Sequence, residues 1–385
     1  MEFMGYLRPD GQVGIRNYVL ILPSVVCANR VAEQIAEAVP GAVALPHPAG
    51  CAQVGADFEQ TKRTLVGFGT NPNVGAVLVV GLGCEGLQPD ELVAAIKPSG
   101  KWVEGIVIQE EGGTPATVRR GTQIAIEMSS ELSQMKREPF PLSELILATE
   151  CGGSDSTSGL AANPALGVAS DLLVEAGGTV ILSETTELMG AEHVLAKRGC
   201  DAATGKELVD IVNKMEEDIL RMGVDLRGSQ PSPGNIAGGL TTIEEKSLGC
   251  IYKAGTTPIN EVLAFAQRPS KKGLVVMDTP GYDIPSVTGM IAGGAQIVVF
   301  TTGRGTPTGA PIAPVIKVTG NPETWEKMRE NLDINAGVIL QGKATKEDVG
   351  KEILAEVIKV ANGKQTRAEI LGHREFAIWR VGPTV

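Results

Sequence analysis

The sequence predicts an α/β protein with two doubly wound domains, each built on a mainly parallel β-sheet, and an active site at the strand ends. Short apolar runs alternate with amphipathic segments, and many runs end in turns rich in glycine, which supplies 48 of the 385 residues. Continuous apolar runs are typical of parallel strands buried on both faces. Their alternation with helical patterns predicts right-handed β-α-β crossovers.

Four strand–turn–helix units are expected in the first domain. The strands are predicted at residues 18–26, 42–45, 76–80 and 103–108, and the helices at 30–39, at 57–68, from Pro89 and from Thr114. Thr114 and Pro115 suit the N-cap and first turn of a long helix. Four consecutive units of this kind predict one parallel sheet.

A short linker is expected at residues 137–142, where Pro139 and Pro141 interrupt the pattern. It divides the chain into an N-terminal α/β domain, residues 1–138, and a C-terminal α/β catalytic domain, residues 139–385. The second domain is predicted to have strands at 145–148, 179–182, 273–277, 296–300 and 315–318, and helices at 164–176, 205–221 and 346–362. The segment 227–239, rich in Pro and Gly, predicts an active-site lid or an interface arm.

The composition favours a cytoplasmic enzyme. Hydrophobic residues make up 43% of the chain, enough for two or three packed domains. The formal charge of -11 argues against nucleic-acid or membrane partners, so an anionic substrate must be captured by local cations and backbone amides. We expect no export signal and no membrane span, because the apolar runs are strand-sized. The six cysteines are expected to be reduced thiols or metal ligands.

Three cysteines follow predicted strands in glycine-rich turns: Cys51, Cys84 and Cys151. Open α/β sheets bind ligands just beyond the carboxyl ends of their strands, so these thiols are candidates for one shared site. His47 and Glu85 lie close to two of them in sequence. Thiolate, imidazole and carboxylate together are typical of a catalytic transition-metal site.

Two metal sites are consistent with this pattern, and the spacing does not choose between them. Cys51, Cys84 and Cys151 are candidates to hold an iron–sulfur cluster with one open iron. Alternatively, His47 binds a single Fe²⁺ together with some of the thiols and with carboxylates such as Glu85. His47 is also a candidate general base. The competing interpretation is that each cysteine is a small buried hydrophobe and that His47 is merely hydrogen-bonded.

The remaining cysteines are expected to be structural: Cys27, Cys200 and Cys250.

The turn after Cys151 is a candidate anion-binding loop. It runs into a helix start at Asn163, where backbone amides and hydroxyls meet a positive helix end. Ser154, Asp155, Ser158 and Asn163 are therefore predicted to contact a carboxylate, sulfonate or phosphate. The competing interpretation is an ordinary hydroxyl-rich helix entry.

Arg304 is the best candidate to clamp a substrate carboxylate, because a guanidinium presents paired donors that match two oxygens. Thr302 lies beside it, and Asn335 lies in a second polar turn, which is alternatively a helix cap. Lys246 and Lys317 are candidates for additional positive charge, and Lys246 is also a candidate catalytic group. A solvated salt bridge is the competing interpretation for either lysine.

Together these motifs resemble the altronate and galactarate dehydratase family of hydro-lyases, in its catalytic large subunit or main domain. The most specific motif is Cys151-Gly152-Gly153-Ser154-Asp155, followed by Ser158-Gly159 and Asn163-Pro164. The other matching segments are 5–17, the turns at Cys51 and Cys84, 233–235, 302–305 and 333–337. The resemblance therefore covers most of the chain.

The resemblance implies a metal-dependent lyase, generally with iron, that removes water from a sugar acid of the altronate or galactarate type to give a 2-keto-3-deoxy acid. Some relatives release sulfite from sulfolactate, so a sulfolactate sulfo-lyase large subunit is the alternative. In either β-elimination the site must stabilise a carbanion beside a carboxylate and assist a leaving group, and a metal ion can do both.

Many members of this family also have a small antifreeze-like domain, either fused or as a separate subunit. We expect a separate small subunit here, or a relative that works without one, and a homo-oligomer of this chain. A nonenzymatic sugar-acid-binding protein is the alternative from another class. An NAD-linked dehydrogenase fits the architecture, but the turns carry no complete dinucleotide fingerprint.

Overall fold

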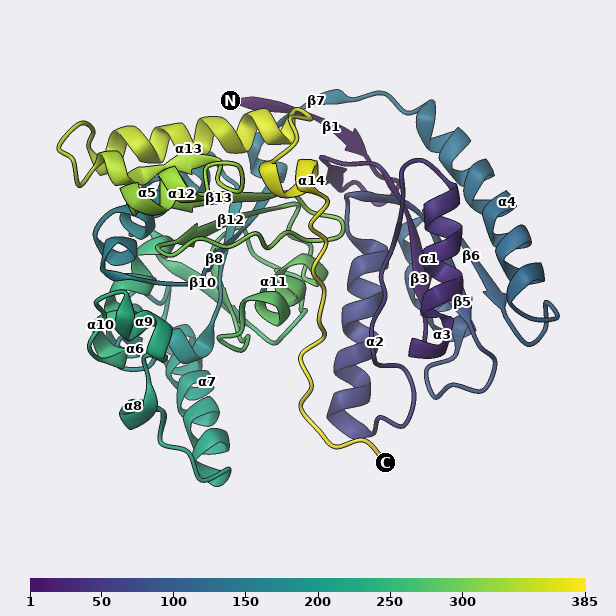
Figure 1. Cartoon of the computed structure of the whole chain (residues 1–385), viewed down its shortest axis with the longest axis horizontal. Coiled ribbons are helices and arrows are strands. Elements are labelled where there is room, and N and C mark those ends of the chain that lie inside the picture. Colours follow the sequence, from purple (N-terminus) through teal and green to yellow (C-terminus); the bar gives the residue numbers. More distant parts are fainter.

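The computed structural model describes residues 1–385, apart from the side chain of Ser229. Figure 1 shows an N-terminal and a C-terminal α/β domain side by side, connected at one end by strands β1 and β7. Each domain contains a parallel sheet with helices on both faces. The predicted fold class is confirmed.

The N-terminal domain contains a four-stranded parallel sheet in the order β4-β3-β5-β6. Its strands are β3 (Tyr18–Pro23), β4 (Ala42–Ala44), β5 (Val74–Gly81) and β6 (Trp102–Val107); its helices are α1 (Asn29–Ala38), α2 (Gly55–Thr70), α3 (Pro89–Ile96) and α4 (Thr114–Ser133). Helices α1 and α4 cover one face, and α2 and α3 cover the other. Because β4 and β5 lie on opposite sides of β3, the carboxyl ends of β3 and β5 flank a topological switch point.

The C-terminal domain contains a seven-stranded parallel sheet in the order β10-β11-β9-β8-β12-β13-β14. Its strands are β8 (Ile146–Cys151), β9 (Thr179–Leu182), β10 (Ile259–Leu263), β11 (Gly273–Met277), β12 (Ile297–Thr302), β13 (Val315–Thr319) and β14 (Ile334–Asn335). Strand β9 pairs with one side of β8 and β12 with the other, so the second switch point lies between β8 and β12.

The helices of the second half are α5 (Asn163–Glu175), α6 (Glu192–Ala196), α7 (Ala202–Arg221), α8 (Leu226–Ser229), α9 (Pro233–Ala237), α10 (Ile243–Cys250), α11 (Asp283–Ala292), α12 (Pro322–Lys327), α13 (Lys346–Ala361) and α14 (Arg367–Leu371). On one face of the sheet, Val299 packs in a cluster with residues of α5, α7 and α13. On the other face, Val298 and Phe300 pack with residues of α11 and also of α2. One hydrophobic cluster therefore spans both domains.

The expected linker at 137–142 is a strand in a small antiparallel sheet. Strand β7 (Glu138–Pro141) pairs with β1 (Glu2–Leu7), which also pairs with β2 (Val13–Gly14). Phe3 lies opposite Phe140 in this register. Its prolines are tolerated because β7 is an edge strand, where a missing N–H costs no ladder hydrogen bond.

The segment after α14 runs back along α2 of the first domain (Figure 1). The Phe376 ring lies 4.9 Å from the Phe68 ring, and Gln60 donates to the Trp379 carbonyl at 2.6 Å. Asp57 on α2 accepts from Arg380 Nε at 2.7 Å and from the Val381 N–H at 2.8 Å. No short-range pattern in the sequence indicated this return.

The other main differences from the predicted elements are in residues 226–292. The segment 227–239 contains the short helices α8 and α9 rather than only loop, and α10, α11 and β10 were not predicted. Helix α11 is buried on all sides along residues 285–292, so it shows little amphipathic periodicity. No helix in the described part of the chain is long and apolar enough to cross a membrane.

The contact between the two domains predicts the effect of Gly67→Ala. A Cβ at this position would lie 2.4 Å from the Ala292 carbonyl oxygen, so α2 and α11 would have to separate. We expect the free energy of unfolding in urea to fall by about 1–3 kcal/mol, which exceeds the helix-propensity gain of about 1 kcal/mol. Glu59→Ala, on the exposed side of α2, is the control. Equal stability of G67A and the parent would contradict this interface.

The carboxylate that holds the C-terminal segment predicts a pH-dependent effect of Asp57→Asn. Burial alone would raise the pKa of Asp57, but hydrogen bonds from Gln53, Val381 and Arg380 lower it below its usual value. A lowered folded-state pKa stabilises the protein above the unfolded-state pKa, and this stability is lost as the pH falls through the folded-state value. We expect D57N to cost about 1–3 kcal/mol at pH 7 and progressively less below about pH 4. Urea unfolding at several pH values measures the difference, and a constant difference would be inconsistent with this ionic role.

Candidate active site

A polar cavity lies at the switch point of the second sheet. The loops after β8 and β12 join there, because the Gly152 N–H donates to Thr301 O at 3.1 Å and the Arg304 N–H to Gly153 O at 2.9 Å. Gly152 is required for close approach, since a Cβ there would lie 2.2 Å from Asp283 Oδ2. This is the edge at which parallel sheets bind ligands.

The cavity has a volume of about 530 Å³ and combines both signs of charge. Residues on its wall include Ser154, Glu187, Asn235, Lys246, Asp283 and Arg304. The Pro- and Gly-rich segment forms one side: Arg304 Nη1 donates to Gly234 O at 2.5 Å and Asn235 Nδ2 to Ser154 O at 2.9 Å. Arg304 itself is exposed, so its remaining donors are available to a ligand.

Below the cavity, Cys151 lies in a buried group of thiols and charges. Its Sγ is 3.0 Å from Glu187 Oε2, 3.7 Å from Cys250 Sγ and 3.0 Å from Lys253 Nζ. Lys253 also pairs with Glu184, and both side chains are fully buried. Burial alone would lower the pKa of Lys253, but the surrounding thiols and carboxylates raise it, so the ammonium stays charged.

Glu184 is held in place by its backbone. It follows β9 in a left-handed conformation with φ of 68°, and its N–H donates to Thr279 Oγ1 at 2.7 Å. Its Oε2 accepts from the Cys151 N–H at 3.0 Å. A non-glycine residue persists in such a conformation only where its surroundings determine it, so the ends of β8, β9 and β11 together position this carboxylate.

A second group contains three carboxyls: Glu150, Glu184 and Asp283, with an oxygen of each within 4.8 Å of the others. Glu150 Oε2 accepts from Ser286 at 2.7 Å, whereas Glu150 Oε1 and Glu184 Oε1 are buried without a hydrogen-bond partner. Burial and the Glu184 charge raise the pKa of Glu150 well above its usual value. Burial, Glu184 and Glu187 raise the pKa of Asp283 to about 7.

These carboxyls outnumber the nearby cations, which predicts binding of protons or a metal ion. Glu150, Glu184, Glu187 and Asp283 face only two ammonium groups, Lys246 and Lys253, among the described residues. Uncompensated buried charge is costly, so the excess must be neutralised. The two orphan oxygens, Glu150 Oε1 and Glu184 Oε1, are the free acceptors.

The buried Cys and Glu residues could therefore bind a metal. The oxygen group of Glu150, Glu184 and Asp283 suits a divalent ion that accepts carboxylates. The mixed group of Cys151, Cys250, Glu184 and Glu187 suits a softer ion. In the mixed group, the Lys253 ammonium contacts both Cys151 Sγ and Glu184 Oε2, whereas the oxygen group keeps two buried acceptors without a partner, Glu150 Oε1 and Glu184 Oε1.

Several residues predicted to bind substrate form hydrogen bonds within the protein instead. Asp155 Oδ1 accepts from Thr157 Oγ1 at 2.6 Å and Oδ2 from Asn321 at 2.9 Å, while Ser158 Oγ accepts from the Asp155 N–H at 3.2 Å. Asn163 bonds Gly249 O and Thr301 Oγ1, Thr302 Oγ1 accepts from the Gly305 N–H, and Asn335 Oδ1 accepts from the Gly337 N–H. These bonds match the helix-entry and cap interpretations. Ser154, Asp155, Ser158 and Asn163 nevertheless line an adjoining cavity of about 210 Å³, so a binding role stays a prediction.

Lys317 is fully buried, and its ammonium forms hydrogen bonds to the loop before β13. Its Nζ donates to Pro307 O at 2.7 Å and to Thr308 O at 3.2 Å. Burial lowers its pKa to about 8. Neither the cavity of about 530 Å³ nor that of about 210 Å³ includes Lys317 in its wall, so its substrate contact is an untested prediction.

The structure does not group Cys151 with Cys51, Cys84 or His47. These three residues lie in the N-terminal domain, and the described group of metal-ligating atoms around Cys151 contains none of them. His47 is buried, its Nε2 lies 2.8 Å from Pro23 O, and its Nδ1 accepts from the Ala49 N–H at 3.2 Å. Burial lowers its pKa to about 4, so it is neutral at pH 7. Both nitrogens are engaged in this arrangement, which leaves neither free to bind a metal or to accept a substrate proton.

The Glu85 carboxylate, like the His47 ring, forms hydrogen bonds within the first domain. It accepts from Ser24 Oγ at 2.6 Å and from the N–H groups of Leu82 and Gly83 at 2.9 and 2.6 Å. Burial alone would raise its pKa, but these hydrogen bonds lower it below the usual value. Metal binding by Glu85, Cys51 or Cys84 therefore stays a prediction.

The site residues that sequence reasoning missed come from distant segments. Glu184 and Glu187 follow β9, and their position after a predicted strand was visible in the sequence, although the predicted site did not include them. Cys250, expected to be structural, and Lys253 lie at the end of α10 and just beyond it, about 100 residues after Cys151. Their spacing shows no pattern that joins them to β8.

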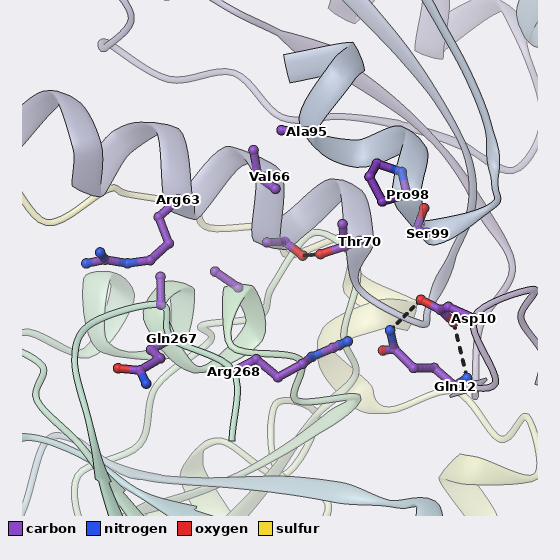
Figure 2. Close-up of a pocket in the computed structure, with 13 residues that line it drawn as sticks. Asp10, Gln12, Arg63, Val66, Thr70, Ala95, Pro98, Ser99, Gln267 and Arg268 are labelled. Carbon is purple, nitrogen blue, oxygen red and sulfur yellow. Dashed lines mark hydrogen bonds between the residues drawn. The ribbon is translucent and has the colours of Figure 1, made fainter. Parts of the chain in front are cut away.

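A different cavity of about 450 Å³ lies between the two domains (Figure 2). Asp10 bonds Gln12, while Arg63 and Arg268 extend in opposite directions, Arg63 donating to Phe265 O at 2.8 Å. In this view Arg268 points toward Gln12, whereas Arg63 points away from it. This cavity lies away from the strand ends, so it is a weaker active-site candidate.

A charged cavity beside acidic groups of raised pKa, at the switch point of a parallel sheet, is the arrangement typical of an α/β enzyme site. Residues 142–384 match the family model "D-galactarate/Altronate dehydratase, C-terminal", and residues 5–133 match "D-galactarate dehydratase/Altronate hydrolase, second domain". The chain therefore belongs to the D-galactarate/altronate dehydratase family, as the sequence motifs indicated.

Three relatives cover nearly all of this chain. The (2R)-sulfolactate sulfo-lyase subunit beta of Chromohalobacter salexigens is 42% identical over 98% of this chain and 97% of its own length. Altronate dehydratase of Escherichia coli is 38% identical over 100% of this chain and 79% of its own length. Galactarate dehydratase (L-threo-forming) of the same organism is 39% identical over 99% of this chain and 77% of its own length.

The buried ion pair predicts a large stability effect of Lys253→Met. Removing the ammonium leaves Glu184 buried without its partner, so we expect a loss of about 3–5 kcal/mol in urea unfolding. Lys206→Met, which breaks the exposed pair with Asp210, should cost under about 1 kcal/mol. The double variant K253M/E184Q should recover part of the loss. A K253M effect no larger than that of K206M would refute the pairing.

Proposed function

We propose that this chain is a lyase that catalyses β-elimination of water from a sugar acid of the altronate or galactarate type. The Cα proton of the 2-hydroxy acid is removed, the C–O bond at the next carbon breaks, and the enol product tautomerises to a 2-keto-3-deoxy acid. The observation that carries this proposal is the cavity in which Arg304 and Lys246 share a wall with Glu187 and Asp283. Family membership supports the reaction class.

Arg304 and Lys246 bind and orient the anionic substrate in this proposal. Arg304 is fixed through Gly234 and presents its other donors to the cavity. Lys246 pairs with Glu187 at 2.6 Å; burial alone would lower its pKa, but Glu187 raises it above the usual value. Lys246 is therefore protonated at pH 7, so it stabilises the enediolate or gives a proton to the leaving hydroxyl rather than acting as a base.

The proton acceptor is one of the two carboxyls on the cavity wall, Glu187 or Asp283. Both carboxyls face the same cavity as the cations, which is the placement that proton transfer requires. His47, the base suggested by the sequence, is in the other domain with both nitrogens engaged. A wall carboxyl is therefore better placed.

We further propose that Glu150, Glu184 and Asp283 hold a divalent metal ion, Fe²⁺ by family resemblance. The two orphan oxygens of this group support metal binding there. A bound ion would act as a Lewis acid toward the substrate's oxygens. When a metal occupies Asp283, Glu187 is the remaining wall carboxyl for proton transfer.

A second candidate reaction is release of sulfite from sulfolactate. The identity of 42% to a sulfo-lyase subunit beta, against 38% and 39% to the two dehydratases from E. coli, favours it. The residues proposed for the dehydration would have the same roles in this reaction. The Cα proton is again removed, and the C–S bond breaks in place of the C–O bond. The word "subunit" in that relative's name also supports our proposal of a separate small partner for this chain.

The reaction and the role of Arg304 are tested together. Iron-replete protein, with and without a small partner subunit, is assayed on altronate, galactarate and sulfolactate by following keto-acid and sulfite formation. We expect turnover of one of them, and Arg304→Gln should lower kcat/KM by roughly 10–100-fold, mainly through KM, because a hydrogen bond to a charged group contributes about 1.5–3 kcal/mol.

Arg221→Gln, on the exposed surface of α7, is the matched control and should keep parental kinetics. Binding without turnover of any of the three acids would favour a nonenzymatic sugar-acid-binding protein. Turnover with unchanged R304Q kinetics would remove Arg304 from the proposed site.

A further inference from the structure

Three cysteines lie at the carboxyl ends of neighbouring strands in the first sheet. Cys27 follows β3, Cys51 follows β4 and Cys84 follows β5, in the sheet order β4-β3-β5. All three side chains are exposed, as is that of Cys200 in the second domain, whereas Cys151 and Cys250 are buried. Free cysteine is usually among the most buried residues, so core packing does not explain this set.

The three cysteine loops are joined to one another by hydrogen bonds. The Val26 N–H, beside Cys27, donates to Ala49 O at 3.0 Å. The carbonyl of Gly50, beside Cys51, accepts from the Leu87 N–H at 3.1 Å. Glu85, beside Cys84, accepts from Ser24 Oγ at 2.6 Å. Each loop therefore contacts another next to its cysteine.

The backbone around Cys51 is fixed in an unusual conformation. Gly50 has φ of 102° and Ala52 has φ of 57°, so the residues on both sides of Cys51 are left-handed. A Cβ on Gly50 would lie 2.0 Å from Ser24 O, which shows how closely this loop packs on the end of β3. His47 adds a hydrogen bond to Pro23 O. Such strain is typical of positions that are shaped for a ligand.

The strand order favours a cluster over a single ion. Tetrahedral zinc with sulfur at about 2.3 Å requires thiolates about 3.8 Å apart. Among the described residues, no group of ligand atoms within 4.8 Å includes these three cysteines. Three neighbouring strands span about 10 Å, and an iron–sulfur cubane suits this wider spacing because its cysteines bind separate irons at its corners.

We propose that Cys27, Cys51 and Cys84 bind a [4Fe–4S] cluster in the N-terminal domain, with the fourth iron open to a ligand from outside these loops. Cys27 and Cys84 flank the switch point between β3 and β5, where sheets of this strand order bind cofactors. The sequence had suggested Cys151 as the third ligand, and Cys27 takes its place here. The proposal does not depend on the reaction proposed for the second domain.

Iron and acid-labile sulfide are to be measured in the full chain purified anaerobically from iron-replete cells. We expect about four sulfides per chain and broad visible absorbance. Cys27→Ser, Cys51→Ser and Cys84→Ser should each remove most of the sulfide and the absorbance. Far-UV circular dichroism should stay unchanged, because the three side chains are exposed.

Two control variants show whether loss of sulfide is specific to the three proposed ligands, and neither requires an activity assay. Cys200→Ser alters an exposed cysteine of the other domain, and Cys151→Ser alters the competing ligand; both should retain parental sulfide. Parental sulfide in C27S, loss of sulfide in C151S alone, or iron without sulfide in the parent would each overturn the proposal. Iron without sulfide would leave the carboxylate metal site of the second domain intact.

Discussion

The ammonium of Lys253 is the interaction on which the charged site of the second domain depends. It joins Cys151 at the end of β8 to Glu184 after β9, and both of these side chains are fully buried. A carboxylate buried without a partner costs several kcal/mol, so Glu184 can be charged at this depth only because a cation accompanies it. The left-handed backbone at Glu184 and its bond to Thr279 then fix the carboxylate at the ends of three strands.

The arrangement of charge around this pair explains how an acidic chain can receive an acidic substrate. The chain has a formal charge of -11, yet Arg304 and Lys246 lie on the wall of the cavity, while Glu150 and Glu184 lie deeper. An incoming anion therefore meets Arg304 and Lys246, beside the wall carboxyls Glu187 and Asp283, before the deeper carboxyls Glu150 and Glu184. The surplus of carboxyls below also favours protons or a metal ion, so substrate and cation binding are expected to support each other.

The sequence was sufficient to predict most strands and the glycine-rich turns at their carboxyl ends, because buried parallel strands are continuous apolar runs followed by glycine turns. Cys151, Lys246 and Arg304, which the sequence suggested as site residues, line two adjoining cavities, and their roles there stay predictions. The sequence did not show which polar side chains form hydrogen bonds within the protein. Asp155 and Ser158 bond each other, and Lys317 bonds a loop that precedes its strand. Contacts between distant segments, such as that of Lys253 with Cys151, cannot be predicted from the periodicity of a single sequence.

The two sheet edges are mechanically connected. Helix α2 begins four residues after Cys51, helix α11 begins at Asp283, and the two helices meet where Gly67 packs on Ala292. Their apolar faces belong to one hydrophobic cluster that spans both domains. Close-packed interiors transmit displacements rather than absorbing them, so a movement of the Cys51 loop would shift α2 and, through Ala292, the helix that carries Asp283. The shared core thus gives a physical route by which ligand binding at one switch point can alter the geometry of the other.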